Sequence, residues 1–157
     1  MAILTGARID HVAYTVPNLE EAVQFFVTVL GWTLLRRSAV SDRGEWMHTQ
    51  VGAPPEASVR LAMLEADEHA LVELFEWQGP DLDGTRPRNC DAGGRHLAVR
   101  VDDLDAAVSA LEAQPDVQLL GEPWRIVEGP SAGSRWIYAR TSWGLDIELI
   151  ERPATSA

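Results

Sequence analysis

Apolar residues recur along this chain at two spacings, one typical of strands and the other of helices. Alternating apolar positions predict a strand around 8–16. Asn18 then provides a helix N-cap, and apolar residues follow at helical spacing until Gly31, where a left-handed residue can end the helix. The same order of signals returns in the second half of the chain, where a helix is expected to begin at Asp103 and to end before Pro115.

Short apolar runs after each helix predict further strands. After the first helix, the expected strands are Thr33–Ser38, Val59–Leu64 and Ala70–Glu76, with an edge strand around Glu45–Val51. After the second helix, the expected strands are Gln118–Leu120, Trp124–Glu128, Trp136–Arg140 and Leu145–Glu151. Between the two halves, residues 78–94 are rich in Gly, Pro and Asp and are expected to form a linker.

An internal repeat relates the two halves. When His11 is placed over His96, the thirteen residues that begin at each histidine share six identities. The last strands of the two halves also match when Glu73 is placed over Glu148. A repeat of this kind predicts a duplicated structural unit. We therefore expect an α+β fold of two tandem βαβββ modules, within a single domain.

The charge of the chain narrows the choice of partners. Among its 157 residues, 24 are acidic and 13 are basic, which gives a formal charge of −11. A strongly anionic protein repels phosphate backbones, so nucleic acid is not an expected partner.

All basic residues are arginines, which excludes a Schiff-base lysine and a lysine-bearing phosphate loop. The single cysteine, Cys90, excludes a disulfide framework and any multi-cysteine metal site.

No apolar run approaches the roughly 20 residues that a membrane helix needs. The first ten residues also lack the basic region and apolar core of a secretory signal. We therefore expect a cytoplasmic protein with no membrane partner.

Strand periodicity predicts where the side chains of chemical interest point. Because alternate residues face opposite sides of a strand, Glu148 lies on the side away from its apolar neighbours, which face the helix. Glu73 points away from the helix in the same manner, and His11 and His96 occupy matching positions on the first strands. Two histidines and two carboxylates could therefore meet at the centre of a pseudo-symmetric molecule.

A divalent cation would stabilise such a cluster. Two carboxylates held together in a cleft repel one another, and a cation relieves that repulsion. Imidazole and carboxylate without thiolate suit zinc, nickel, cobalt, iron or manganese better than calcium. A single histidine or glutamate on a strand is more often structural or solvated than a ligand. The recurrence of both residue types in both halves favours the metal, although the residues alone leave both interpretations open.

Four segments carry a resemblance to a known family, and together they span nearly the whole chain. They are IDHVAYTVPNLEEAVQFFVTVLGW (9–32), LVELFEW (71–77), GGRHLAVRVDDLDAAVSAL (93–111) and GSRWIYARTSWGLDIELIE (133–151). These segments resemble the vicinal-oxygen-chelate superfamily, which includes glyoxalase I, methylmalonyl-CoA epimerase, extradiol dioxygenases and the bleomycin- and fosfomycin-resistance proteins.

The resemblance implies a single glyoxalase-like domain over 1–157. Its two βαβββ modules would span 7–77 and 95–152, joined by the linker 78–94, and would form a cupped mixed sheet around a central cavity. The ligands of the family's metal come from the first and last strand of each module. On this sequence those positions are His11, Glu73, His96 and Glu148.

The chemistry that the resemblance implies is proton transfer next to a carbonyl through a metal-stabilised enolate, as in an epimerase, an isomerase or a glyoxalase-type lyase. A metal with two open positions acts as a Lewis acid, and a carboxylate beside it can serve as the base. Glu148 and Glu73 are the candidate catalytic residues. The expected cofactor is one divalent ion of nickel, cobalt, manganese, zinc or iron, and the expected partners are a small-molecule substrate and a second copy of the chain in a homodimer.

Three other classes of protein belong to the same superfamily. An extradiol-type dioxygenase would use iron on a triad that His11, His96 and Glu148 could form, but Glu73 would then occupy the position needed for oxygen. A non-catalytic drug-binding resistance protein commonly lacks the metal ligands, and this sequence keeps all four. Fosfomycin-type thiol transfer generally uses three ligands. Metal analysis of the purified protein separates these alternatives.

Overall fold

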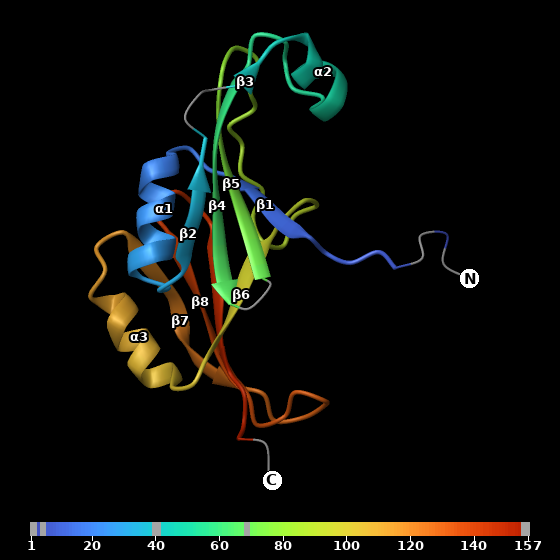
Figure 1. The fold of residues 1–157 in the computed structure, drawn as a ribbon. Coiled ribbons are helices and arrows are strands. Elements are labelled where there is room, and N and C mark those ends of the chain that lie inside the picture. Colours follow the sequence, from blue (N-terminus) through green and yellow to red (C-terminus); the bar gives the residue numbers. More distant parts are fainter. Residues whose placement is uncertain (1–2, 4–5, 39–41, 68–69, 155–157) are drawn as a thin grey trace. The chain divides into compact units, whose positions relative to one another are not determined.

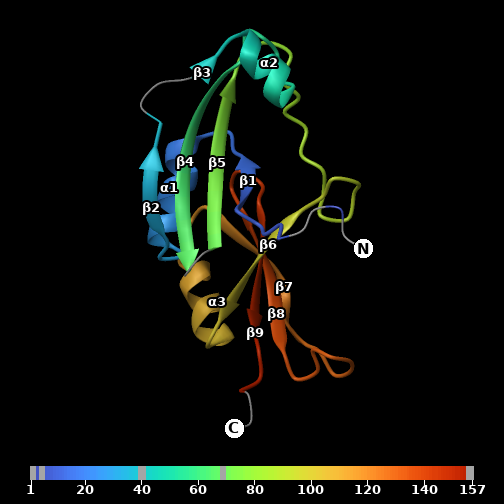
Figure 2. The same cartoon turned by 45° about the vertical axis from the view of Figure 1, so that its right-hand side comes forward.

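The computed structural model describes residues 3, 6–38, 42–67 and 70–154. The chain divides into two compact units, Met1–Asp83 and Gly84–Ala157 (Figures 1 and 2). Each unit begins with a strand and a helix and ends with antiparallel strands. Among the described residues no helix is long and apolar enough to cross a membrane.

The first unit is a mixed sheet with one long and one short helix. Its elements are β1 (His11–Thr15), α1 (Leu19–Thr28), β2 (Thr33–Arg37), β3 (Asp42–Arg43), α2 (Glu45–Val51), β4 (Ser58–Asp67) and β5 (Ala70–Gln78). The strand order is β1-β5-β4-β2, and the short β3 pairs with β4. Strand β1 runs parallel to β5, whereas the other pairs are antiparallel.

The second unit repeats this arrangement without counterparts of β3 and α2. Its elements are β6 (His96–Val101), α3 (Leu104–Glu112), β7 (Val117–Arg125), β8 (Arg135–Thr141) and β9 (Asp146–Glu151). The strand order β6-β9-β8-β7 is the order of the first unit, strand for strand, and β6 is again parallel to β9. The predicted fold class, α+β with two βαβββ modules, is confirmed.

The predicted helix starts are confirmed by their caps. The Asn18 side chain accepts hydrogen bonds from the amides of Glu20 and Glu21 at 3.1 and 3.2 Å. In the second unit, the carboxylate of Asp103 accepts from the Ala106 amide at 2.9 Å. Past the end of α1, Gly31 turns the chain with a φ of +74°, a conformation that costs glycine little.

Two expectations about strands were wrong. Residues 45–51, expected as an edge strand, form helix α2, which is bracketed by Gly44 and Gly52 with φ of +117° and +71° and buries Met47 on one face. The two strands expected within 118–128 are one strand, β7, because a bulge at Gly121, with φ of +83°, shifts the register without ending the ladder.

Each helix covers one face of its own sheet. Helix α1 packs against β2, β4 and β5, and α3 packs against β7 and β9. The buried face of the last strands consists of Val72 and Leu74 in the first unit and of Ile147 and Leu149 in the second, all at most 3% exposed. Alternation along the strand therefore turns the glutamate between each apolar pair towards the opposite face.

Candidate functional site

The first unit places His11 next to Glu73. Strands β1 and β5 are neighbours, and Glu73 lies opposite Ala13, two residues along from the histidine on the same side. The imidazole Nε2 of His11 is 3.3 Å from Oε2 of Glu73. The Glu73 side chain is only 9% exposed, whereas that of His11 is 36% exposed. A nearly buried carboxylate therefore faces an accessible imidazole.

The second unit builds the same pair from the repeated residues. Strand β6 places His96 next to β9, where Glu148 lies opposite Ala98. The Nε2 atom of His96 is 3.2 Å from Oε2 of Glu148, and the Glu148 side chain is 19% exposed. The four residues singled out in the sequence therefore form two pairs, one in each unit, with nearly equal separations.

The other ring nitrogen of each histidine contacts an oxygen. Nδ1 of His11 is 2.8 Å from Oδ2 of Asp10, and Nδ1 of His96 is 3.0 Å from Oδ1 of Asn89. Both oxygens are acceptors, so they assign the proton of a neutral ring to Nδ1 and leave a lone pair on Nε2. Metal-bound histidines have this arrangement, in which a carboxylate or carbonyl oxygen holds the distal N–H.

The donor set of each pair fits a divalent metal ion. An imidazole nitrogen and a carboxylate oxygen lie 3.3 Å apart in the first unit and 3.2 Å apart in the second, and neither group is a thiolate. Within the part of the chain that the structure describes, no group of three or more His, Cys, Asp or Glu side chains is gathered. Each unit by itself thus presents two candidate ligands.

The surroundings of Glu73 engage both of its oxygens. Besides the contact of Oε2 with His11, the guanidinium of Arg36 lies 3.5 Å from Oε1. Opposite Glu73 on β4 lies Met63, whose thioether has no hydrogen-bond donor. The guanidinium of Arg36 therefore lies against one oxygen of this carboxylate, and the imidazole of His11 faces the other.

The surroundings of Glu148 engage only one oxygen. The hydroxyl of Tyr138, which lies opposite Glu148 in the β8–β9 ladder, donates to Oε2 at 3.3 Å. His96 contacts the same Oε2, and among the described residues no hydrogen bond or ion pair is made to Oε1. Burial raises the pKa of Tyr138, the negative charge of Glu148 raises it further, and a hydrogen bond with Asn89 lowers it in part. The phenol therefore remains a donor.

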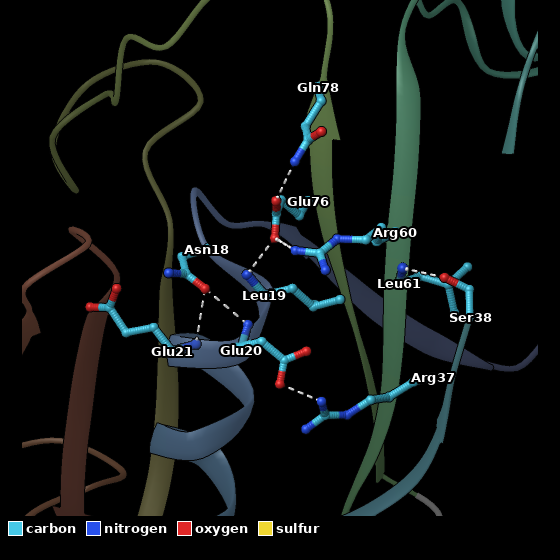
Figure 3. A network of polar contacts seen from close by, with 10 residues as sticks. All are labelled: Asn18, Leu19, Glu20, Glu21, Arg37, Ser38, Arg60, Leu61, Glu76 and Gln78. Atoms are coloured by element: carbon cyan, nitrogen blue, oxygen red, sulfur yellow. Dashed lines mark hydrogen bonds and ion pairs between the residues drawn. The ribbon is translucent and has the colours of Figure 1, made fainter. Parts of the chain in front are cut away.

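A second pair of repeated carboxylates was missed in the sequence. Figure 3 shows the first of them, Glu76, whose Oε2 accepts from the Leu19 amide at 2.8 Å and from Arg60 at 2.6 Å. In the second unit, Oε2 of Glu151 accepts from the Leu104 amide, also at 2.8 Å. Each carboxylate ties the last strand of its unit to the first amide of the helix.

The signal for this second pair was present in the chain. Glu76 and Glu151 each lie three residues beyond the glutamate of their His–Glu pair, so the alignment that matches Glu73 with Glu148 also matches them. Their odd spacing places them on the opposite side of the strand, towards the helix. They are therefore part of the framework rather than of the candidate site.

The chain belongs to the glyoxalase/bleomycin resistance protein/dioxygenase superfamily, whose family model matches residues 8–149. Its repeated modules are what the sequence resemblance implied, whereas a metal held by the four His and Glu residues stays a prediction. The chain is 46% identical over 149 residues to a 2-epi-5-epi-valiolone epimerase from an Actinomyces species, a match that covers 95% of this chain and 81% of the relative. It is 28% identical over 124 residues to the mitochondrial methylmalonyl-CoA epimerase of Bos taurus, a match that covers 76% of this chain and 60% of that protein.

A solved structure shares the fold. The glyoxalase family protein APC24694 from Bacillus cereus superimposes with a TM-score of 0.76 at 28% identity, with 97% of this chain and 98% of that one covered. Relatives that carry the names of epimerases support an enzyme of this superfamily.

Proposed function

We propose that this protein is a divalent-metal-dependent epimerase that moves a proton next to the ketone of a small polyhydroxylated ring. The observation that carries the proposal is the His–Glu pair that recurs with the same geometry in both units, at 3.3 and 3.2 Å. The choice of a ketocyclitol rests on the relative at 46% identity, which is named for the epimerisation of 2-epi-5-epi-valiolone. A glyoxalase-type lyase would use the same proton chemistry on a different substrate.

The proposed ligands of the metal are His11, Glu73, His96 and Glu148, two from each unit. The tautomer assigned by Asp10 and the matching contact in the second unit support ligation through Nε2. A bound divalent ion would supply Lewis acidity and so stabilise negative charge on a carbonyl oxygen.

Glu148 is the proposed base. Its Oε1 can accept a proton from the carbon beside the ketone while Oε2 stays with Tyr138 and His96. Glu73 remains the second candidate catalytic residue. It would first take up a proton from solvent and then return that proton to the opposite face of the carbon, while the proton held by Glu148 leaves to solvent. That role requires Arg36 to leave Oε1, a movement open to a long side chain that is 62% exposed.

The experiment is deuterium wash-in from heavy water. The purified protein, loaded with manganese, nickel or cobalt, is incubated with 2-epi-5-epi-valiolone, and the carbon-bound proton is followed by NMR. We expect exchange that depends on the metal and is lost in E148Q. The matched control is E151Q, which removes a carboxylate from the same strand on the helix side and should keep the exchange rate.

Other outcomes would point to other functions. Exchange on hemithioacetals but not on the cyclitol would indicate a lyase. Bound metal without exchange on any carbonyl substrate would contradict the proposal and favour oxygen or thiol chemistry. A protein that binds no divalent ion would favour a drug-binding module.

The proposal also includes a homodimer acting on a small-molecule substrate. Light scattering should then give twice the mass of the chain. A cytoplasmic location stays a prediction from the sequence, and cell fractionation tests it.

A further inference from the structure

We propose that Tyr138 is a positioning residue that orients the carboxylate of Glu148 for proton transfer. This inference rests on the proposed function, because it concerns the base of that reaction. Tyr138 and Glu148 are direct partners in the antiparallel β8–β9 ladder, and the phenol donates to Oε2 at 3.3 Å. Side chains directly opposite one another on one face of a sheet lie close enough for such a contact.

The ring of Tyr138 is itself held in place. It lies edge-on to the imidazole of His96, with centroids 5.3 Å apart and an angle of 89°, and edge-on to the indole of Trp136 at 5.5 Å and 79°. Edge-to-face pairs at such separations are favourable arrangements of aromatic rings. Since a tyrosine has few rotatable bonds, rings on two sides leave its hydroxyl little freedom. The carboxylate therefore receives its hydrogen bond from a fixed donor.

The hydrogen bond selects one carboxylate oxygen over the other. Both Tyr138 and His96 contact Oε2 of Glu148, and within the described residues Oε1 is contacted by neither hydrogen bond nor ion pair. Rotation about the last side-chain bond would turn the plane of the carboxylate, and the hydrogen bond from the tyrosine opposes that rotation. The oxygen without a partner is thus held in one direction.

The first unit acts as an internal control for this role. Met63 occupies the place opposite Glu73 that Tyr138 occupies opposite Glu148, yet the His11–Glu73 separation of 3.3 Å matches the 3.2 Å of the second pair. A His–Glu pair therefore forms without a tyrosine. The hydroxyl is not needed to build the pair, which leaves orientation of the carboxylate as its contribution.

The test compares Y138F with Y14F. The chain has two tyrosines, and Tyr14 lies on the buried face of β1, so Y14F removes the same hydroxyl away from the site. With 2-epi-5-epi-valiolone as substrate, Y138F should lower kcat by about 10- to 100-fold, because small misplacements of a reacting group have effects of this size. KM should change less than about twofold, and the Mn²⁺ dissociation constant from calorimetry should stay within about threefold, whereas Y14F should match the wild type in all three.

Crystal structures of the same variants provide a readout that needs no turnover. We expect Glu148 in one orientation in the wild type and in Y14F, and in more than one in Y138F. An unchanged kcat in Y138F, a loss of Mn²⁺ binding that accounts for the loss of turnover, or an unmoved Glu148 would each overturn the inference. A wild-type protein that exchanges no proton would instead refute the proposed function, and the crystal structures would still decide whether Tyr138 holds Glu148.

Discussion

Two pairs of carboxylates recur in the two units of this chain. One of these pairs makes the same main contact in both units. Glu76 and Glu151 each accept a hydrogen bond from the first amide of their helix, and the distance is 2.8 Å in both. Both units need this link, because the first amides of a helix have no partner within the helix. The same requirement for folding applies to both copies, and both meet it with the same hydrogen bond.

The other repeated pair of carboxylates has different neighbours in the two units. Glu73 and Glu148 each face a histidine, but Arg36 takes the remaining oxygen of the first, whereas Tyr138 shares the engaged oxygen of the second. If both carboxylates only held a metal, nothing would require different neighbours. We therefore propose that the two copies have separate tasks, with Glu73 mainly a ligand and Glu148 open towards substrate.

The strongest test of this comparison is to neutralise each carboxylate in turn. We expect E148Q to lower kcat by about 10²- to 10⁴-fold, the range for loss of a general base. If Glu73 acts mainly as a ligand, E73Q should lower kcat by at most about tenfold, because an amide oxygen can still serve in that role. If Glu73 also returns the proton, the loss should approach that of E148Q. Steady-state rates at matched metal occupancy measure both. Equal losses in the two variants would remove the functional distinction between the units.

A subtler test exchanges the partners of the two histidines. D10N gives His11 the neutral partner that His96 has, and N89D gives His96 the charged one. A carboxylate raises the basicity of the ring it holds, so D10N should weaken Mn²⁺ binding and N89D should strengthen it, each by roughly 3- to 10-fold. The change for Asp10 should lie at the low end, since its side chain is 87% exposed. Calorimetric titration with Mn²⁺ gives both constants, and shifts of the same sign would contradict the assigned tautomers.

Most of the fold could be predicted from the sequence because its signals are local and occur twice. The caps at Asn18 and Asp103 and the alternation along the last strands need no knowledge of distant contacts. Helix α2 was missed because two turns are too short to show a clear helical period, and β7 was divided because the bulge at Gly121 resembles a turn in sequence.

The candidate site could be predicted only in part. Residue type and strand parity identified the two histidines and two glutamates, and each unit brings its own pair together. The role of Tyr138 depends on the register between β8 and β9, and the contact of Asn89 depends on how a Gly- and Pro-rich segment folds back onto His96. Neither register nor loop path is encoded in local periodicity.

The smallest expected effects concern the shared framework. At pH 7, E76Q should lower the free energy of unfolding by about 2 kcal/mol, the usual scale for hydrogen bonds to a charged group. E151Q should lower it by about 1 kcal/mol, a typical value for a lost helix cap. The smaller effect is expected because the Glu151 side chain is 25% exposed, whereas that of Glu76 is 9% exposed. Urea unfolding followed by tryptophan fluorescence measures both, and a larger loss in E151Q would contradict the ranking.

The effect of Glu76 should also depend on pH. Burial on its own would raise the pKa of Glu76, but hydrogen bonds from the Leu19 amide, Gln78 and Arg60, with the charge of Arg60, bring it below the ordinary value. A carboxylate with a lowered pKa in the folded state stabilises the fold fully above its unfolded pKa and loses that contribution as the pH falls through the folded value. The difference between wild type and E76Q should therefore be greatest above the ordinary pKa of a glutamate and should narrow over the acidic range below it. A difference that stays constant over this range would show that packing, rather than the ionised carboxylate, is what Glu76 contributes to the framework.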